Sequence, residues 1–399
     1  MHVPEGWKYQ PIKYLCESII DCVNKTAPVV EYKTPYKMIR TTNVRYGKVD
    51  THNVRYVEEK TYLNWIRRGA PRKGDVIFTR EAPVGESGIL DSEDSVFLGQ
   101  RTMMYRADPH VSNNLFLLYS LQTRFCQKQI ENFSNGGTVA HMRVPDCGEI
   151  ILRVPPLPEQ HKIAQILSTW DKAIEKLECL ITAKKKRKKA LMQQLLTGKR
   201  RFIGFDEEWK YLKANELFKT SSQKKNGGND ELLAVTQDQG VLPRHLLDRR
   251  VAMPDGSTEG YKLVEPGNFI ISLRSFQGGL EYSNYKGLVS PAYTVLKPIK
   301  NISDDFYRHY FKSYEFIGHL AVAVIGIRDG KQISYEDFSF LKLPYPPIEE
   351  QNKIAVVLST ADKEIGAHQK QLIVLNEENR GLLQQLLTGK RRVKLARIN

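Results

Sequence analysis

The chain has 399 residues, enough for two or three domains, and its 41% hydrophobic and 26% charged residues are ordinary for a globular protein. An excess of 60 Lys and Arg over 45 Asp and Glu favours a polyanionic partner such as nucleic acid, although some basic proteins have none. No apolar run approaches the roughly 18 residues that span a bilayer. Five cysteines without a C-x-x-C pair disfavour a disulfide framework or a zinc site. We therefore expect a cytoplasmic protein with reduced thiols and no membrane segment.

Residues 1–154 predict a compact α+β domain that is rich in strands and in Gly and Asn turns. Its turns gather Arg, Asn, Gln and Thr, the side chains that contact base edges in the grooves of DNA. Polar residues are also expected in any exposed turn, so a structural role stays open for each of them. The candidates for nucleic-acid contact in this segment are Arg40, Thr41, Asn43, Arg45, Arg80, Gln100 and Arg101.

Residues 155–201 predict one long helix. A Pro pair and Glu-Gln open it, Thr-Gly ends it, and the 39 residues from Glu159 to Thr197 contain no Pro or Gly. One continuous helix of this length spans roughly 58 Å at 1.5 Å per residue. Apolar residues recur with the alternating spacing of four and three that marks a coiled-coil seam. The ten seam positions are Ile163, Leu167, Trp170, Ile174, Leu177, Ile181, Lys184, Lys188, Leu191 and Leu195.

Residues 202–345 predict a second α+β domain. The stretch from Pro266 to Ser283 has the same pattern as the stretch from Lys73 to Leu90: a Gly, a polar residue, an apolar strand, and an Arg just before a turn. Its polar turns supply a second set of candidates for nucleic-acid contact, which are Arg274, Gln277, Tyr293, Arg328 and Lys331.

Residues 346–399 contain a second copy of the long helix. Between residues 155–201 and 346–392, 23 of 47 positions are identical, and both copies end in QQLLTGKRR. Such identity indicates a duplication. The simplest partner for each helix is the other copy, paired antiparallel about a pseudo-twofold axis. The seam of the second copy is Ile354, Leu358, Ala361, Ile365, His368, Leu372, Leu375, Asn379, Leu382 and Leu386.

Two polar features of these helices leave alternatives open. Lys188 and Asn379 occupy equivalent seam positions, where a polar residue either fixes the register of the two helices or marks a place where the seam splays. The run KKKRKK (Lys184–Lys189) is the densest charge in the chain. It is a solvated helix face, a docking site for a protein, or a contact for phosphates.

Motifs of catalysis are missing from the sequence. There is no P-loop, no Gly-rich turn that would hold a nucleotide or S-adenosylmethionine, and no Asn-Pro-Pro-aromatic of the amino-methyltransferase kind. A nuclease-like acid triple can be assembled only from the scattered Asp21, Glu31 and Lys33. We expect a chain without catalytic activity, cofactor or metal.

The layout of two variable domains alternating with two nearly identical helices resembles the specificity (S) subunit of type I restriction–modification systems. Each helix follows P-P-x-x-E-Q and precedes L-L-T-G-K-R-R. Phrases similar to those of the target recognition domains of this family also stand in the variable domains. They are EAPVGE (Glu81–Glu86), GQRTM (Gly99–Met103), SPAYTV (Ser290–Val295) and GIRDGKQIS (Gly326–Ser334).

The resemblance implies a non-catalytic subunit. Target recognition domains at 1–154 and 202–345 would each read half of a split sequence in double-stranded DNA. The helices at 155–201 and 346–399 would act as a spacer and dock two modification subunits. Those partners would methylate adenine with S-adenosylmethionine, and motor–nuclease restriction subunits would use ATP and Mg.

The alternative is a stand-alone sequence-specific DNA-binding regulator, which has the same charge and no catalytic motif. An enzyme in its own right would need a cofactor or metal motif. A pure coiled-coil scaffold is disfavoured by the basic charge and by the two Arg-rich domains.

Overall fold

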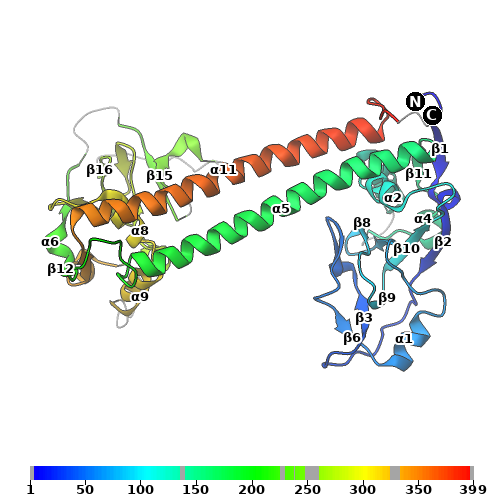
Figure 1. The fold of residues 1–399 in the computed structure, drawn as a ribbon, viewed down its shortest axis with the longest axis horizontal. Helices are drawn as coiled ribbons and strands as arrows, with labels where there is room; N and C mark the ends of the chain where they lie inside the picture. The colour runs from blue at the N-terminus through cyan, green and yellow to red at the C-terminus, as the bar shows by residue number, and fades with distance from the viewer. Residues whose placement is uncertain are drawn as a thin grey trace. The chain divides into compact units, whose positions relative to one another are not determined.

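The computed structural model describes residues 4–134, 140–224, 230–237, 239–247, 260–323 and 333–395. The chain divides into two compact units. Unit 1 comprises Met1–Leu177 and Gln371–Asn399, and unit 2 comprises Glu178–Lys370. Each unit therefore contains one variable domain and a stretch of both long helices (Figure 1).

The two long helices are continuous, as the sequence predicts. Helix α5 runs over Leu157–Leu195 (39 residues) and α11 over Ile348–Leu387 (40 residues). All twenty predicted seam positions are buried or half-buried. In unit 1 the first turns of α5 pack against the last turns of α11, with Ile163 and Leu386 in one core. In unit 2 the last turns of α5 pack against the first turns of α11. The pairing is antiparallel in both units, which confirms the predicted arrangement.

The two polar seam residues each bind an aspartate of the facing helix. In unit 2, Lys188 Nζ lies 2.5 Å from Asp362 Oδ1. In unit 1, Asn379 Nδ2 donates to Asp171 Oδ1 at 3.0 Å. Asp171 and Asp362 are themselves equivalent in the repeat. The seam does not splay at these positions, and the polar pairs fix its register.

The phrase QQLLTGKRR ends in an arginine that binds the other copy of the repeat. In unit 1, Arg392 donates from Nε and Nη2 to the two carboxylate oxygens of Glu159, at 2.7 and 2.8 Å. Glu159 is 3% exposed and also accepts a hydrogen bond from Trp7 Nε1 at 3.2 Å. Gly389, with φ of 69°, takes the left-handed conformation that turns the chain out of α11.

Unit 2 repeats this contact with the equivalent residues. Arg201 donates to both oxygens of Glu350 at 2.5 and 2.8 Å, and Trp209 Nε1 donates to Glu350 Oε2 at 2.8 Å. Each arginine belongs to one copy of the repeat and each glutamate to the other. We call these two contacts the crosswise clamps. They give the Glu at the start of each helix and the second Arg after its end a shared role in both copies of the repeat.

The variable domain of unit 1 is built on a six-stranded sheet, in the order β2-β10-β7-β8-β5-β4, whose apolar face packs against α2 and α3. A three-stranded sheet β6-β3-β9 and the pair β1-β11 complete it. The strands are β1 (Lys8–Pro11), β2 (Cys16–Asp21), β3 (Tyr36–Ile39), β4 (Val44–Arg45), β5 (Gly47–Val49), β6 (Arg55–Tyr56), β7 (Val76–Arg80), β8 (Val84–Ile89), β9 (Ser95–Leu98), β10 (Thr102–Ala107) and β11 (Ile151–Val154). The helices are η1 (Ile12–Leu15), η2 (Thr41–Asn43), α1 (Glu59–Trp65), α2 (Asn114–Leu121), α3 (Arg124–Ser134) and α4 (Val144–Cys147).

The variable domain of unit 2 has a smaller sheet, β13-β20-β17-β18, and three strand pairs, β12-β21, β14-β15 and β16-β19. Its core is aromatic, with the ring of Phe218 next to those of Phe269, Tyr307, Phe311 and Phe338. The strands are β12 (Lys210–Lys213), β13 (Phe218–Ser221), β14 (Leu233–Thr236), β15 (Gly240–Pro243), β16 (Lys262–Val264), β17 (Phe269–Ile271), β18 (Glu281–Tyr282), β19 (Gly287–Val289), β20 (Thr294–Pro298) and β21 (Lys342–Tyr345). The helices are α6 (Ala214–Leu217), η3 (Arg244–Leu246), α7 (Ser275–Gly278), α8 (Asp304–Tyr310), α9 (Tyr314–Ala323) and α10 (Tyr335–Ser339).

Candidate nucleic-acid interface

The strand register in unit 1 brings several predicted contact residues to one edge of the six-stranded sheet. Met103 lies opposite Asp21, and Thr102 lies opposite Thr79, so the ends of β2 and β7 meet the start of β10. The turns at this edge come from segments far apart in the sequence. We call this set the unit 1 edge; it consists of Asp21, Arg80, Glu81, Gln100, Arg101 and His141.

Glu81 joins two exposed side chains at the unit 1 edge. Its carboxylate lies 3.2 Å from Arg101 Nη2 and 3.3 Å from His141 Nδ1. The Glu81 side chain is 18% exposed, whereas those of Arg101 and His141 are 53% and 43% exposed. Arg101 has φ of 70°, a left-handed conformation that costs free energy for a residue other than Gly and gathers at functional sites. Arg101 therefore presents its guanidinium to solvent from a fixed position.

His141 is a member of this edge that the sequence did not single out. It forms a β-bridge with Glu81, 60 residues away in the chain. The only signal in the sequence is its position in a Gly-rich polar stretch, which marks a turn without saying what the turn faces.

Arg80 has a structural role here, and we withdraw it as a base contact. Its side chain is 7% exposed, lies 3.0 Å from Asp21 Oδ1, and donates to the carbonyl of Met142 at 3.2 Å. Burial, the largest cause, raises the pKa of the neighbouring Cys22 thiol. A guanidinium held this way fixes the loop that carries His141 and does not extend towards DNA.

The predicted residues from Arg40 to Arg45 lie beside Gln100, but their side chains mainly hold their own turn. The N–H of Gly99 donates to the carbonyl of Ile39, which brings η2 next to the exposed Gln100. Asn43 is 4% exposed; its Oδ1 accepts the Arg40 N–H and its Nδ2 donates to the carbonyl of Asn53. We withdraw Asn43 as a base contact for this reason.

Arg45 is half-buried and is likewise tied to its own turn. Its Nη1 donates to the carbonyls of Thr41 and Val44 at 2.9 and 2.7 Å. Arg40 and Thr41 are also half-buried. Of the residues in unit 1 that were predicted to contact nucleic acid, Gln100 and Arg101 have exposed side chains.

Unit 2 has an edge of the same construction. Val295 lies opposite Ser221 and Thr294 opposite Ile271, so the ends of β13 and β17 meet the start of β20. The turn before β20 is closed by Tyr293 N–H donating to the carbonyl of Ser290 at 3.1 Å. Thr102 and Gly99 form the equivalent bond in unit 1, at 3.3 Å. The unit 2 edge consists of Arg274, Gln277 and Tyr293.

The strand register shows which residues of the two edges are equivalent, and the arginines of the shared sequence pattern are not equivalent to each other. Because Tyr293 takes the place of Thr102, the register places Leu273 where unit 1 has Arg80, and Arg274 where unit 1 has Glu81. Arg274 is exposed, as is Gln277 in the helix that follows. The shared pattern of an Arg before a turn therefore joins two residues with different roles.

Tyr293 is half-buried, and its carbonyl accepts a hydrogen bond from Lys262 Nζ at 2.6 Å. Burial lowers the pKa of Lys262. The predicted residues Arg328 and Lys331 lie outside the described part of the chain.

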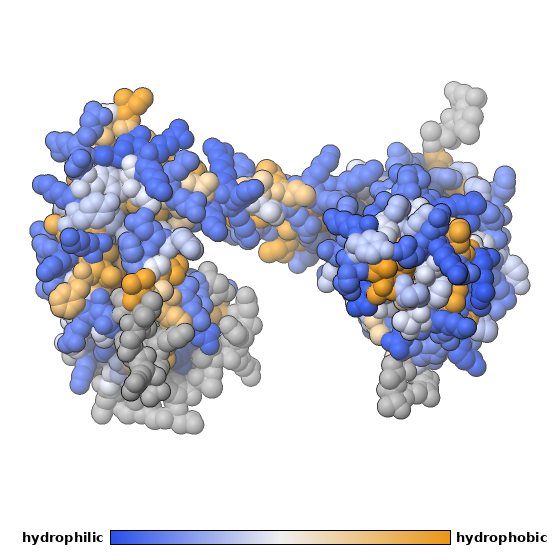
Figure 2. All heavy atoms as spheres, turned by 90° about the horizontal axis from the view of Figure 1, so that it is seen from below, coloured by the Kyte–Doolittle hydropathy of each residue, from blue (hydrophilic) through white to orange (hydrophobic). Residues whose placement is uncertain are grey.

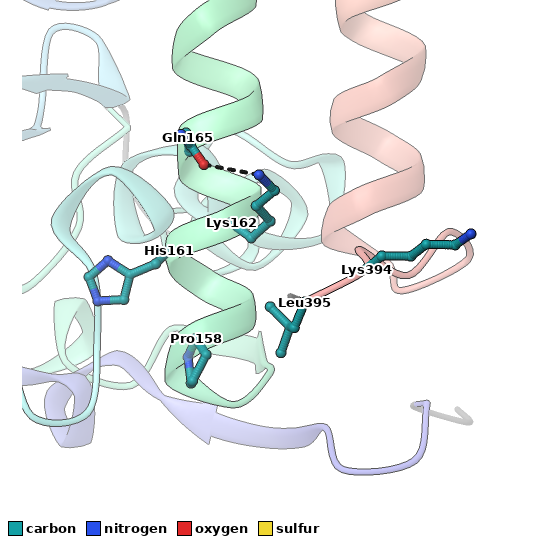
Figure 3. Close-up of a pocket in the computed structure, with 6 residues that line it drawn as sticks. All are labelled: Pro158, His161, Lys162, Gln165, Lys394 and Leu395. Atoms are coloured by element: carbon teal, nitrogen blue, oxygen red, sulfur yellow. Dashed lines mark hydrogen bonds between the residues drawn. The ribbon is translucent and has the colours of Figure 1, made fainter. Parts of the chain in front are cut away.

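One pocket lies at the start of α5. Figure 3 shows this pocket, which is lined by residues of that helix and by Lys394 and Leu395 of the chain that follows α11; the His161 ring points away from Leu395. The one hydrogen bond between its residues joins Lys162 to Gln165 at 3.2 Å. Within the described ranges, no three His, Cys, Asp or Glu residues are placed to hold a metal ion, and no helix is both long and apolar enough to cross a membrane.

Comparison with known proteins decides the family. The model of the type I restriction modification DNA specificity domain matches residues 4–184 and again residues 207–377. The chain belongs to this family. The double match agrees with the internal repeat, since each matched stretch contains one edge and most of one long helix.

Relatives and solved structures of this family match nearly the whole chain. A Methanocaldococcus jannaschii protein named for the specificity subunit of type I restriction enzyme MjaX is 26% identical, over 98% of this chain and 95% of its own. The MjaVIII specificity subunit of the same organism is 25% identical, over 83% and 85%. The crystal structure of a type I restriction–modification S subunit from M. genitalium matches with a TM-score of 0.61 at 17% identity, over 99% of each chain, and shows the fold.

Proposed function

We propose that this chain is the non-catalytic DNA specificity subunit of a type I restriction–modification complex. The observation that carries the proposal is the combination of two crosswise clamps, equivalent residue by residue, with two edges whose side chains differ. Two equivalent clamps give the two helices the same framework, which suits two copies of one partner, and different edges suit two different half-sites. The unit 1 edge would read one half of a bipartite duplex target and the unit 2 edge the other half.

The long helices would dock two modification subunits. Apolar side chains stand exposed on α11, at Val356 (65%), Ile373 (61%) and Val374 (52%). Figure 2 shows apolar residues among the hydrophilic ones on the long helices. Exposed apolar surface of this kind suits a protein partner. S-adenosylmethionine, ATP and Mg would be bound by the modification and restriction subunits and not by this chain.

The test is to compare methylation by the chain alone, by the modification subunit alone, and by the two together. We expect adenine methylation at one bipartite sequence only from the pair, and methylome sequencing of cells with and without this gene should return the same sequence. Methyl transfer or cleavage by the purified chain alone would contradict the proposal. Tight, target-specific binding without any modification partner would favour the stand-alone regulator.

Arg101 and Arg274 offer a test of half-site reading. Arg101→Ala should weaken recognition at one base pair of one half-site by about 1–3 kcal/mol, the size of a bidentate contact with guanine, and Arg274→Ala should act on the other half-site only. Binding to targets with single base-pair changes measures this. Arg101→Lys is the matched control, because Lys keeps the charge but not the bidentate geometry. If Arg101→Lys restores full discrimination, Arg101 contacts a phosphate and reads no base.

A further inference from the structure

The basic run on α5 has no counterpart in the second copy of the repeat. The positions equivalent to Lys184–Lys189 on α11 are Leu375–Arg380, with the sequence LNEENR. The helix starts and the closing QQLLTGKRR are retained on either side, so the divergence is confined to the middle of the repeat. We take a feature that is found in a single copy of the repeat to serve a contact that is made by that copy alone.

The facing helix does not cancel this difference. Residues 184–189 with the facing residues 361–366 carry seven cationic side chains and two carboxylates. The symmetry-related residues 375–380 and 170–175 carry two cationic side chains and four carboxylates. One surface is therefore strongly positive and its equivalent is weakly negative. No single docking surface on two identical subunits is complementary to both.

The structure shows which charges of the run are already used. Lys184 binds Glu364, and Lys188 binds Asp362 at 2.5 Å; both lysines lie on the seam with side chains 23% and 20% exposed. These two pairs belong to the coiled coil.

The remaining four side chains, Lys185, Lys186, Arg187 and Lys189, are exposed. In the described part of the chain no carboxylate lies within ion-pair distance of any of the four. Four unpaired cations within five residues of one helix form an electrostatic contact for a polyanion.

We propose that Lys185, Lys186, Arg187 and Lys189 form a second, sequence-independent DNA contact, distinct from the two edges, that binds phosphates of the duplex. This inference rests on the proposed function, because it takes the duplex as the partner. Contacts with phosphates carry no sequence information, so we expect this contact to add affinity and to leave the target sequence unchanged. The phosphates of the duplex supply the negative charge that is complementary to the run.

The experiment is a salt titration of DNA binding by the full chain in complex with its modification subunit. In the test variant, Lys185, Lys186, Arg187 and Lys189 are all replaced by Gln, while Lys184 and Lys188 keep the coiled coil. If two to four phosphate contacts are lost, the slope of log affinity against log salt should fall by about 2 to 4. Affinity for target and for random DNA should fall by the same factor, and the methylated sequence should not change.

The control variant replaces four other exposed lysines of the same helices by Gln, namely Lys162, Lys172, Lys176 and Lys370. It has the same net charge as the test variant and should keep the parent slope within about 1. Equal slopes for the two variants would show a general effect of net charge and overturn the proposal. An unchanged slope with weaker binding of the modification subunit would overturn it too, and would make the run a protein-docking face. A parent complex that methylates no bipartite target would contradict the proposed function instead, whatever the slopes.

Discussion

Replacing Glu350 by alanine is expected to lower the free energy of unfolding of unit 2 by about 3–5 kcal/mol, the cost of removing one partner from a buried ion pair. Glu350 is fully buried and is the acceptor for both Arg201 and the indole N–H of Trp209. Without Glu350, the guanidinium of Arg201 loses its counter-charge, and the Arg201 side chain is only 22% exposed to water. Chemical denaturation of the full chain, followed by hydrogen exchange at the start of α11, measures the loss and its location.

Two variants serve as controls for this prediction. Glu349→Ala removes the exposed neighbouring carboxylate and should change stability by no more than about 0.5 kcal/mol. Glu159→Ala opens the equivalent clamp of unit 1, where the Arg392 side chain is 45% exposed and regains water more easily. Its cost should be smaller than that of Glu350→Ala. Equal costs at Glu350 and Glu349 would mean that the clamp contributes nothing beyond surface charge.

Lengthening both long helices should lengthen the unread gap of the DNA target. Four residues inserted after Glu178 alone add about 6 Å and about 40° of rotation to one helix, and should abolish target binding because the facing helix keeps its length. The same insertion after both Glu178 and the equivalent Gln369 leaves the seam pairs of each unit in place. It should restore binding with a gap one or two base pairs longer, since 6 Å is about two base-pair steps.

Selection of bound DNA from a random library, with the parent and both insertion variants, gives the half-sites and the gap together. The half-sites should be the same for the parent and the double insertion. If the double insertion changes a half-site and leaves the gap as it was, the helices do not set the spacing of the target.

The sequence predicted the helices well because the signals for a helix are local. The heptad spacing, the Pro pair at the start and the Gly at position 198 or 389 all act within a few residues, and the second copy repeated the evidence. The clamps were not predicted, because Arg201 and Glu350 are 149 residues apart and no spacing rule joins them. The clamp residues occur at equivalent positions in both copies of the repeat, and this repetition is the feature of the sequence from which the clamps could have been predicted.

The interface was predicted only in part, for a related reason. Arg80 and Arg101 look alike in the sequence, as arginines next to a turn. Their difference is tertiary: Arg80 lies against Asp21 in the sheet, whereas Arg101 extends from a left-handed turn into solvent. Exposure of a long polar side chain depends on partners from distant segments, so residue type alone does not separate anchors from exposed residues.

The crosswise clamps also have a consequence for how genes of this kind can duplicate and exchange their variable domains. Each half, one variable domain followed by one helix, carries an arginine and a glutamate whose ion-pair partners both lie in the other half. Neither clamp depends on the peptide linkage between the halves. A gene for a single half would encode a chain that completes both clamps with a second copy of itself, reading a palindrome. Joining two such halves frees each to mutate separately, so exchange of one variable domain between genes creates a new target while both arginine–glutamate pairs are kept.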